Sequence, residues 1–316
     1  MELRQLRYFV TVVEEANFTR AAARLHVAQP GVSAQIGQLE RELGQRLLDR
    51  TGRAVTPTQV GAAVLPYARA ALAAVDAVRE TVDEFTGLLR GRVAIGLVSG
   101  AATHAFDMAG LLAGFHASHP EVEIALTEDT SERMLAALRA GELDIAMVGL
   151  AEPGPPPGLA LRLVVDEPLV AAMAPGDALA AEDGELPLSA LRGRRLICLP
   201  RGTGVRGVLD RLCAEAGFAP QVAFEAAAPH LLAQLAARGL GVAVVPALPE
   251  ETGEPSGLRL RPLAGPRARG RVALAWRTDG PSGPAAQALL DLLHDALPVP
   301  TGGANLLHED APHPRA

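Results

Sequence analysis

Two thiols, Cys198 and Cys213, are the side chains with the clearest potential for covalent chemistry in this chain. Cys198 lies in the apolar segment LICLP, and Cys213 lies in a segment expected to be helical. A reactive thiol needs a positive neighbour that lowers its pKa, and only Arg194, Arg195 and Arg211 are close in the sequence. The pattern favours buried, inert thiols, with a thiol-based redox sensor as the alternative.

A glycine-rich segment, GTGVRG at Gly202–Gly207, has the spacing of a dinucleotide-binding loop. It follows the expected strand RRLICLP and precedes a helix, and Glu225 ends the next expected strand, where a ribose-binding acid would lie. Against this, Pro200 and Arg201 intervene before the first glycine, and the unit lies deep in the second half of the chain. A nicotinamide-dependent oxidoreductase is therefore the weaker alternative. The same glycines would let the backbone approach a small ligand.

Other catalytic patterns are missing from the sequence. The segment GLVSG does not have the G-x-S-x-G spacing of a hydrolase nucleophile. No spacing of His with Cys or Glu matches a zinc site. We therefore expect no enzymatic activity, no metal and no cofactor.

The composition is that of a soluble globular protein. The 316 residues are 49% hydrophobic and 21% charged, unlike a disordered chain. No unbroken apolar run reaches the roughly 18 residues of a membrane span, and the start MELRQLRYFV lacks the pattern of a secretory signal. Two cysteines suit a reducing compartment. We expect a cytoplasmic protein without membrane contact, which excludes a secreted solute-binding protein.

Charge is spread unevenly along the chain. Residues 1–57 hold eight arginines and six acidic residues, a net charge of +2, whereas the whole chain carries −7, so the rest carries −9. A basic N-terminal segment followed by an acidic remainder is expected if only the N-terminal segment binds nucleic acid.

Hydrophobic spacing predicts three short helices at the N-terminus. The first ends at about Glu15, the second runs from an N-cap at Thr19 to Leu25, and the third begins at Gln29 or Pro30 and ends at Gly44. The segment LLDRTGRAVTPT then predicts a hairpin wing. This order is typical of a winged helix-turn-helix.

A long helix should follow the wing. Apolar residues recur by fours and threes from Val60 to Leu89, a narrow seam that indicates pairing with another long helix. We expect a dimer-forming linker, and the alternative is a helix packed on its own second domain.

From residue 91 the pattern alternates between strand and helix, which predicts a parallel sheet with helices on both faces. Its length suggests two lobes. The expected domains are 1–58, a helix at 59–89, and 91–298, in which lobe I covers about 91–163 and 267–298 and lobe II about 164–266. Residues 299–316 are expected to be a disordered tail.

The N-terminal run MELRQLRYFVTVVEEANFTRAAARLHVAQPGVSAQIGQLERELGQRLLDRTGRAVTPTQVG resembles the winged helix-turn-helix of LysR-type transcriptional regulators. The segments GELDIAMVG and GLGVAVVP resemble the effector domain of that family. The resemblance implies an α/β chain with an N-terminal all-α winged helix-turn-helix, a long linker helix and a two-lobed, doubly wound, periplasmic-binding-like effector domain. It also implies promoter DNA, a small-molecule effector and a second copy of the chain (a dimer or tetramer) as partners. RNA polymerase is a further partner if the protein activates transcription.

The resemblance also assigns roles to individual residues. Base-reading positions fall on the third helix, and phosphate contacts fall on the second helix and the wing: Gln29, Pro30, Ser33, Ala34 and Gln38, then Thr19, Arg50 and Arg53. The family often carries Arg where this chain has Ala34, which removes one expected base contact. A face of small and amide side chains can still enter a major groove and reach base edges.

Effector contacts are assigned to strand ends between the lobes: Ser99, Ala101, Thr130, Ser131, Gly149, Arg201, Thr203 and Ala227. Physical reasoning agrees, because ligands of open α/β sheets gather where strands end and helices begin. Helix N-termini and hydroxyl groups there favour a carboxylate. The alternative is that the Ser and Thr residues only cap helices.

Overall fold

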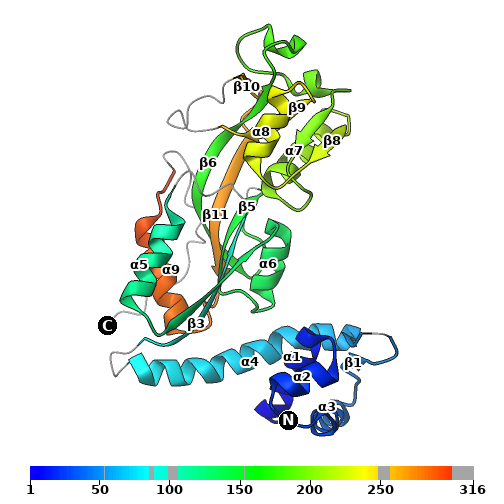
Figure 1. The fold of residues 1–316 in the computed structure, drawn as a ribbon, viewed down its shortest axis with the longest axis vertical. Coiled ribbons are helices and arrows are strands. Elements are labelled where there is room, and N and C mark those ends of the chain that lie inside the picture. The colour runs from blue at the N-terminus through cyan, green and yellow to red at the C-terminus, as the bar shows by residue number, and fades with distance from the viewer. Residues whose placement is uncertain (53, 85–88, 99–105, 153, 248–256, 301–316) are drawn as a thin grey trace.

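The computed structural model describes the chain except for residues 53, 85–88, 99–105, 153, 248–256 and 301–316 (Figure 1). Three of the residues assigned above, Ser99, Ala101 and Arg53, lie outside the described part, as does most of the expected tail.

The N-terminal headpiece is a small helical unit with a two-stranded wing. Its elements are α1 (Leu3–Glu15), α2 (Phe18–Arg24), α3 (Gln29–Leu43), β1 (Leu48–Asp49) and β2 (Thr56–Pro57). Phe9, Val32, Ile36 and Leu39 are fully buried in its core. The spacing of the last three gives α3 one inward face and leaves the opposite face free.

The cap of α2 differs from the expected one. Asn17, not Thr19, is the N-cap: its side-chain oxygen accepts from the N–H of Thr19 at 2.8 Å and of Arg20 at 3.1 Å. The sequence NFT offers two capping side chains, and Asn is at least as good a cap as Thr. Thr19 therefore lies in the first turn, where its side chain is exposed.

Helix α4 (Gln59–Glu84) connects the headpiece to the rest of the chain (Figure 1). Thr58 caps it by accepting from the N–H of Gly61 at 3.0 Å. The helix packs on α1, yet Tyr67 is 77% and Val78 66% exposed. In length and composition alone, Gln59–Val78 is apolar enough to cross a membrane.

A single mixed sheet organises the remaining chain. Along it the strands follow the order β4-β3-β5-β11-β6-β9-β7-β8, with β10 paired to β6. Their bounds are β3 (Gly91–Leu97), β4 (Val122–Glu128), β5 (Ile145–Leu150), β6 (Leu159–Met173), β7 (Leu196–Cys198), β8 (Val222–Glu225), β9 (Val242–Pro246), β10 (Arg259–Pro262) and β11 (Arg269–Arg277). Only two groups, β4-β3-β5 and β8-β7-β9, are parallel. The expectation of a parallel sheet is therefore wrong for β6, β10 and β11, which run antiparallel to their neighbours.

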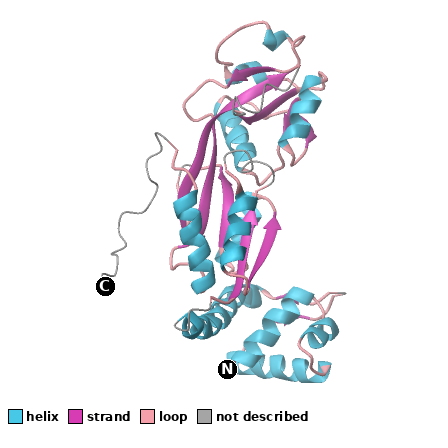
Figure 2. Cartoon of the chain, turned by 60° about the vertical axis from the view of Figure 1, so that its left-hand side comes forward, coloured by secondary structure: helices cyan, strands magenta, loops and turns pink. Residues whose placement is uncertain are grey.

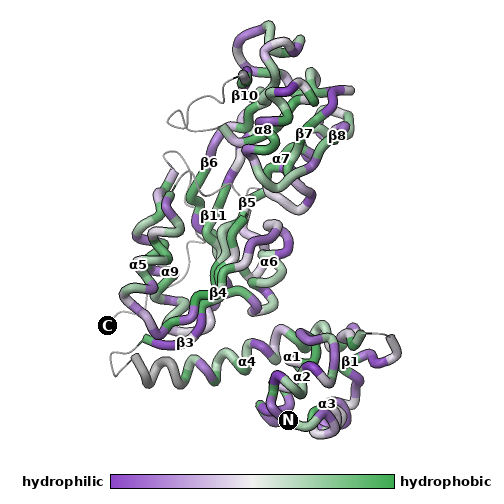
Figure 3. The backbone as a smooth tube through the Cα atoms, in the orientation of Figure 1, coloured by the Kyte–Doolittle hydropathy of each residue, from purple (hydrophilic) through white to green (hydrophobic). Residues whose placement is uncertain are grey.

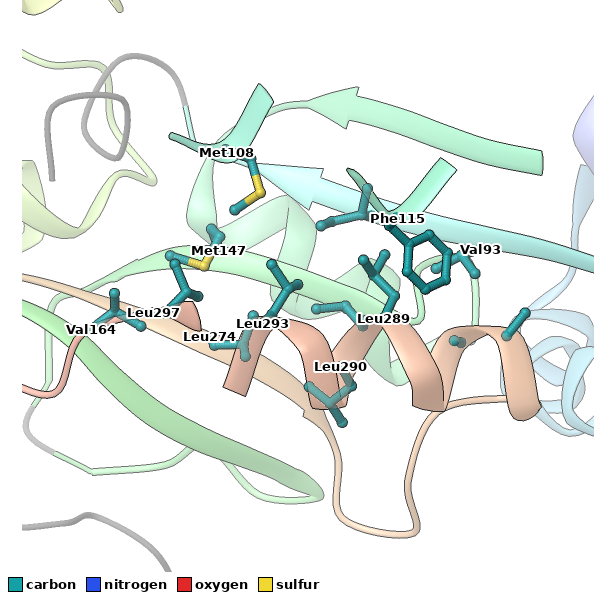
Figure 4. Close-up of a cluster of buried hydrophobic side chains, with 14 of the residues drawn as sticks. Val93, Met108, Phe115, Met147, Val164, Leu274, Leu289, Leu290, Leu293 and Leu297 are labelled. Atoms are coloured by element: carbon teal, nitrogen blue, oxygen red, sulfur yellow. The ribbon is translucent and has the colours of Figure 1, made fainter. Parts of the chain in front are cut away.

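Helices cover both faces of the sheet (Figure 2). They are α5 (Met108–Ser118), α6 (Ser131–Arg139), α7 (Gly204–Glu215), α8 (Pro229–Ala237) and α9 (Pro284–Ala296), with two short 3-10 turns at Ala178–Ala180 and Leu188–Leu191. In lobe I, α9 places Leu289, Leu290 and Leu293 against Phe115 and Met147 (Figure 4). When the chain is coloured by residue hydropathy, the most hydrophobic residues lie in the strands at the centre of each lobe (Figure 3).

Two long strands join the lobes. The first ten residues of β6, Leu159–Pro168, pair with β11, and the last five, Leu169–Met173, pair with β9 and β10. Val164 and Val165 belong to the core of lobe I, whereas Leu169 belongs to that of lobe II. The chain therefore passes from lobe I to lobe II between Val165 and Leu169, a few residues later than the boundary at 163/164 that the sequence suggests.

Candidate functional sites

The outward face of α3 carries the small and amide residues that the sequence singles out. Gln29, Pro30, Ala34 and Gln38 are exposed, and Ser33 is half-buried. α3 lies at the outer edge of the headpiece, away from the two lobes (Figure 1). Cβ atoms built at Gly31 and Gly37 would meet nothing within 4 Å. The face is thus open along its whole length.

Arg50 in the wing is held by contacts within the headpiece. Its guanidinium donates to Glu40 Oε2 at 2.9 Å and stacks over the ring of Phe18 at 5.0 Å. The other oxygen of Glu40 accepts from the N–H groups of Leu47 (2.9 Å) and Leu48 (3.2 Å). These bonds fasten the wing to α2 and α3.

A cavity of about 210 Å³ lies between the lobes. It contains five of the residues assigned to effector binding: Thr130, Ser131, Gly149, Thr203 and Ala227. Arg201 instead lines a neighbouring surface hollow, together with Arg133 and Glu132. The cavity lies where α6 and α7 begin, so two helix N-termini face it.

The hydroxyl groups of this pocket already have partners. Ser131 Oγ accepts from the N–H of Gly149 at 2.9 Å, and Thr203 Oγ1 donates to the carbonyl of Pro200 at 2.7 Å. Thr130 caps α6 by accepting from the N–H of Arg133 at 3.4 Å. The capping alternative thus describes Thr130, while Ser131 and Thr203 shape the pocket wall.

Sequence reasoning missed the charged residues of the pocket. Asp129, Glu167 and Arg271 line it, and Arg271 lies 3.4 Å from Asp166, measured from Nε to Oδ1. Glu167 and Arg271 come from β6 and β11, the strands whose antiparallel course was not foreseen. Val98, Val165, Leu199, Pro246 and Val272 supply much of the remaining wall. A small cavity with apolar walls and two carboxyl groups is not a strongly cationic site.

The lobes touch through backbone at this point. Gly204, the first residue of α7 in lobe II, lies against Gly149 in lobe I so closely that a Cβ would be 2.3 Å from the carbonyl carbon of Gly149. Beside it, the N–H of Glu132 donates to the carbonyl of Gly202 at 3.0 Å. Of the glycines in GTGVRG, Gly204 is thus required for the contact between the lobes, and a Cβ at Gly207 would likewise lie 2.6 Å from the Cβ of Ala151.

Both thiols are buried in the core of lobe II, Cys198 at the end of β7 and Cys213 on α7. Burial raises the pKa of Cys198 to about 12 and that of Cys213 to about 11. Arg206 opposes the shift at Cys198, but its guanidinium is bound to Asp210 and Glu225, both at 2.9 Å. Glu225, the acid that a dinucleotide site would need, is therefore paired with Arg206. The pocket has no cysteine among its described lining residues.

Helix α4 links the headpiece to lobe I through charged side chains. Arg69 on α4 is bound to Glu142 of lobe I and lies 3.8 Å from Glu14 on α1, while Glu14 receives Arg24 at 2.8 Å. This chain of charges links α1, α2 and α4 to the turn before β5.

Comparison with known proteins gives two family matches that together span most of the chain. Residues 3–62 match the family described as "Bacterial regulatory helix-turn-helix protein, lysR family", and residues 86–298 match "LysR substrate binding domain".

Named relatives and solved structures agree with these matches. A "Probable hydrogen peroxide-inducible genes activator" of Mycobacterium avium is 35% identical over 276 residues, 86% of this chain and 87% of the relative. The structure of a full-length OxyR variant from Pseudomonas aeruginosa is similar with a TM-score of 0.70 at 28% identity, covering 94% of both chains. Full-length CbnR complexed with its target DNA is similar with a TM-score of 0.56 at 25% identity, covering 94% of this chain and all of that one.

Proposed function

Because this chain belongs to the LysR family of transcriptional regulators, we propose that it binds promoter DNA in the bacterial cytoplasm and responds to hydrogen peroxide. It is a DNA-binding regulator and not an enzyme. The open face of α3 supports insertion of that helix into the major groove.

Dimerisation through α4 is part of this proposal. Tyr67 and Val78 leave apolar surface on α4 that the chain itself does not cover. A second copy pairing along this seam would present two α3 helices to successive major grooves.

Peroxide is the better supported signal. The relatives include several proteins named as hydrogen peroxide-inducible genes activators, at 30–35% identity. The carboxylate expected from the sequence is supported by the N-termini of α6 and α7 and by Arg271, although Asp129 and Glu167 line the same wall. Hydrogen peroxide is small and neutral, so these two carboxyl groups do not repel it.

The chemistry by which peroxide would act is constrained by the thiols. The thiolate is the form that attacks peroxide, and with a pKa of about 12 Cys198 is ionised in roughly one molecule in 100,000 at pH 7. Oxidation of Cys198 or Cys213 would therefore require lobe II to open. This redox route is the second candidate mechanism, beside simple binding of a ligand in the pocket.

The test uses the full-length protein and a labelled duplex from the region upstream of its own gene. DNA binding is measured with and without low-micromolar hydrogen peroxide, and in parallel with a panel of small carboxylates. We expect peroxide to change the affinity or the footprint. A response to a carboxylate together with none to peroxide would refute the proposed signal.

Two thiol variants, Cys198→Ala and Cys213→Ala, separate the mechanisms. Loss of the peroxide response in either variant, with loss of free thiols in the wild type, supports the redox route. A response that persists in both variants would exclude Cys198 and Cys213 as the residues that carry it.

A further inference from the structure

The headpiece has an open hollow beside the outward face of α3 whose arginines have no assigned role. It has a volume of about 820 Å³ and is bounded by the C-terminal half of α3, the turn after it and the start of α4. Its lining is Gly37, Glu40, Arg41, Gly44, Gln45, Arg46, Thr58, Gln59 and Val60. Gly37 belongs to the outward face as well, so the hollow continues that face.

The two arginines of this hollow are free of carboxylate partners. Among the described residues of the headpiece, Arg7, Arg41 and Arg46 form no ion pair, and two of these three line the hollow. Asp49 is near Arg46, but the pKa of Asp49 is lowered mainly by hydrogen bonds from Thr51 and least by Arg46. A cation left unpaired on an exposed surface is available to an anion.

A backbone hydrogen bond holds Arg41 along α3. Arg41 is one turn after Gly37, and its Nε donates to the carbonyl of Gly37 at 3.2 Å. This bond turns the guanidinium back along the helix toward the outward face of α3. The remaining N–H groups of the Arg41 guanidinium can still donate hydrogen bonds to a phosphate.

Two further features make the hollow favourable for an anion. Glu40 is its one carboxylate, and Arg50 and two backbone N–H groups already neutralise it. Gln59 and Val60 begin α4 at the edge of the hollow, where the first N–H groups of a helix have no intrahelical partner.

We propose that Arg41 and Arg46 are phosphate contacts of the headpiece, in the role that the family resemblance gives to Thr19, Arg50 and Arg53. Arg50 fastens the wing through Glu40 and Phe18. Arg41 and Arg46 lie at the C-terminal end of α3, where a helix inserted by its N-terminal part meets the DNA backbone. They supply positive charge beside the outward face of α3, where Ala34 and Gly37 contribute none. This inference rests on DNA binding by α3.

The experiment measures the salt dependence of DNA binding for full-length Arg41→Gln and Arg46→Gln. Fluorescence anisotropy is recorded between 50 and 300 mM KCl on two labelled duplexes, the region upstream of the gene and a scrambled duplex of the same length. Each phosphate contact contributes about 0.9 to the slope of log K against log salt. We expect Arg41→Gln and Arg46→Gln each to lower the slope by about 0.9 per headpiece on both duplexes.

The matched control is Arg238→Gln at the end of α8, which changes the same charge at the opposite end of the molecule (Figure 1). Its slope should equal the wild-type slope. An unchanged slope in both hollow variants, or a loss confined to the upstream duplex, would overturn the assignment to phosphates. Absence of wild-type binding to any duplex would instead refute the DNA-binding function itself.

Discussion

Replacing Gly204 with Ala should separate the two lobes. The new Cβ would lie 2.3 Å from the carbonyl carbon of Gly149 and 2.6 Å from the N of Leu150, both backbone atoms. Non-bonded carbons ordinarily approach to about 3.5 Å, so α7 must move by about 1.2 Å away from β5. Since this contact joins lobe I to lobe II, the movement opens the pocket.

The expected cost of Gly204→Ala follows from this overlap. Inserting a methyl group into a packed contact costs about 1–3 kcal/mol, and at roughly 2–4 °C per kcal/mol the midpoint of thermal unfolding should fall by several degrees. The control is Gly114→Ala within α5, where a Cβ meets no atom within 4 Å. There the gain in helix propensity, up to about 1 kcal/mol, should raise the midpoint.

Thermal unfolding of the wild type and both variants, followed by circular dichroism, compares the two substitutions directly. Both substitutions add one methyl group, so shifts of the unfolding midpoint in opposite directions report the different packing around the two glycines. If Gly204→Ala melts at or above the wild-type temperature, the close approach of Gly204 to Gly149 is not present in solution and the reasoning fails.

Three further predictions test other parts of the structure. Ser33→Glu places a negative charge on the face of α3 and should abolish specific binding to the upstream duplex with an unchanged circular dichroism spectrum; an unaltered gel shift would count against the role of α3. Tyr67→Glu and Val78→Glu charge the uncovered side of α4 and should convert a dimer to monomers in light scattering, whereas an unchanged mass would exclude this seam as the interface. The pKa of His294 is lowered mainly by burial and secondarily by Arg162, while Asp291 and Asp295 oppose the shift. The unfolded chain therefore binds more protons below the ordinary histidine pKa of about 6.5, and the free energy of unfolding should fall as the pH drops from 6.5 toward 5. His294→Gln should flatten that part of the pH profile, measured by urea unfolding with the fluorescence of Trp276, the one tryptophan; an identical profile in the variant would exclude His294 as the cause.

The headpiece could be predicted closely because local signals define it. Gly44 ends α3 with a φ of 67°, a left-handed conformation that glycine adopts without strain. Val32, Ile36 and Leu39 identify the inward face by spacing alone. The prediction of Thr19 as the cap is wrong because two good capping residues, Asn17 and Thr19, lie two positions apart, and the sequence alone does not show which one the backbone uses.

The effector domain was less predictable because the order of its strands depends on pairing between segments that are far apart in the sequence. β6 contains Asp166, Glu167 and Pro168 in its middle, which suggest a break, yet β11 pairs with it on that side and the strand continues. Thr130, Ser131 and Thr203 could be placed in the pocket because they lie where α6 and α7 begin. Glu167 and Arg271 could not, since they reach it from antiparallel strands. The helix α9 was missed, although a Pro at its start and apolar residues at Ala285, Leu289 and Leu293 would have predicted it.

The two strands shared by the lobes also bear on how the protein is made. Lobe II lies between β6 and β11, so the ribosome releases it before β11 and α9 have left the exit tunnel. Until then Val93, Phe115 and Met147 of lobe I lack the leucines of α9 that cover them. Domains of a nascent chain fold as units in order of synthesis, so the headpiece and lobe II can fold while lobe I still exposes apolar surface. Lobe I is thus the last part to close, and a chain that ends prematurely before Pro284 is expected to depend on chaperones.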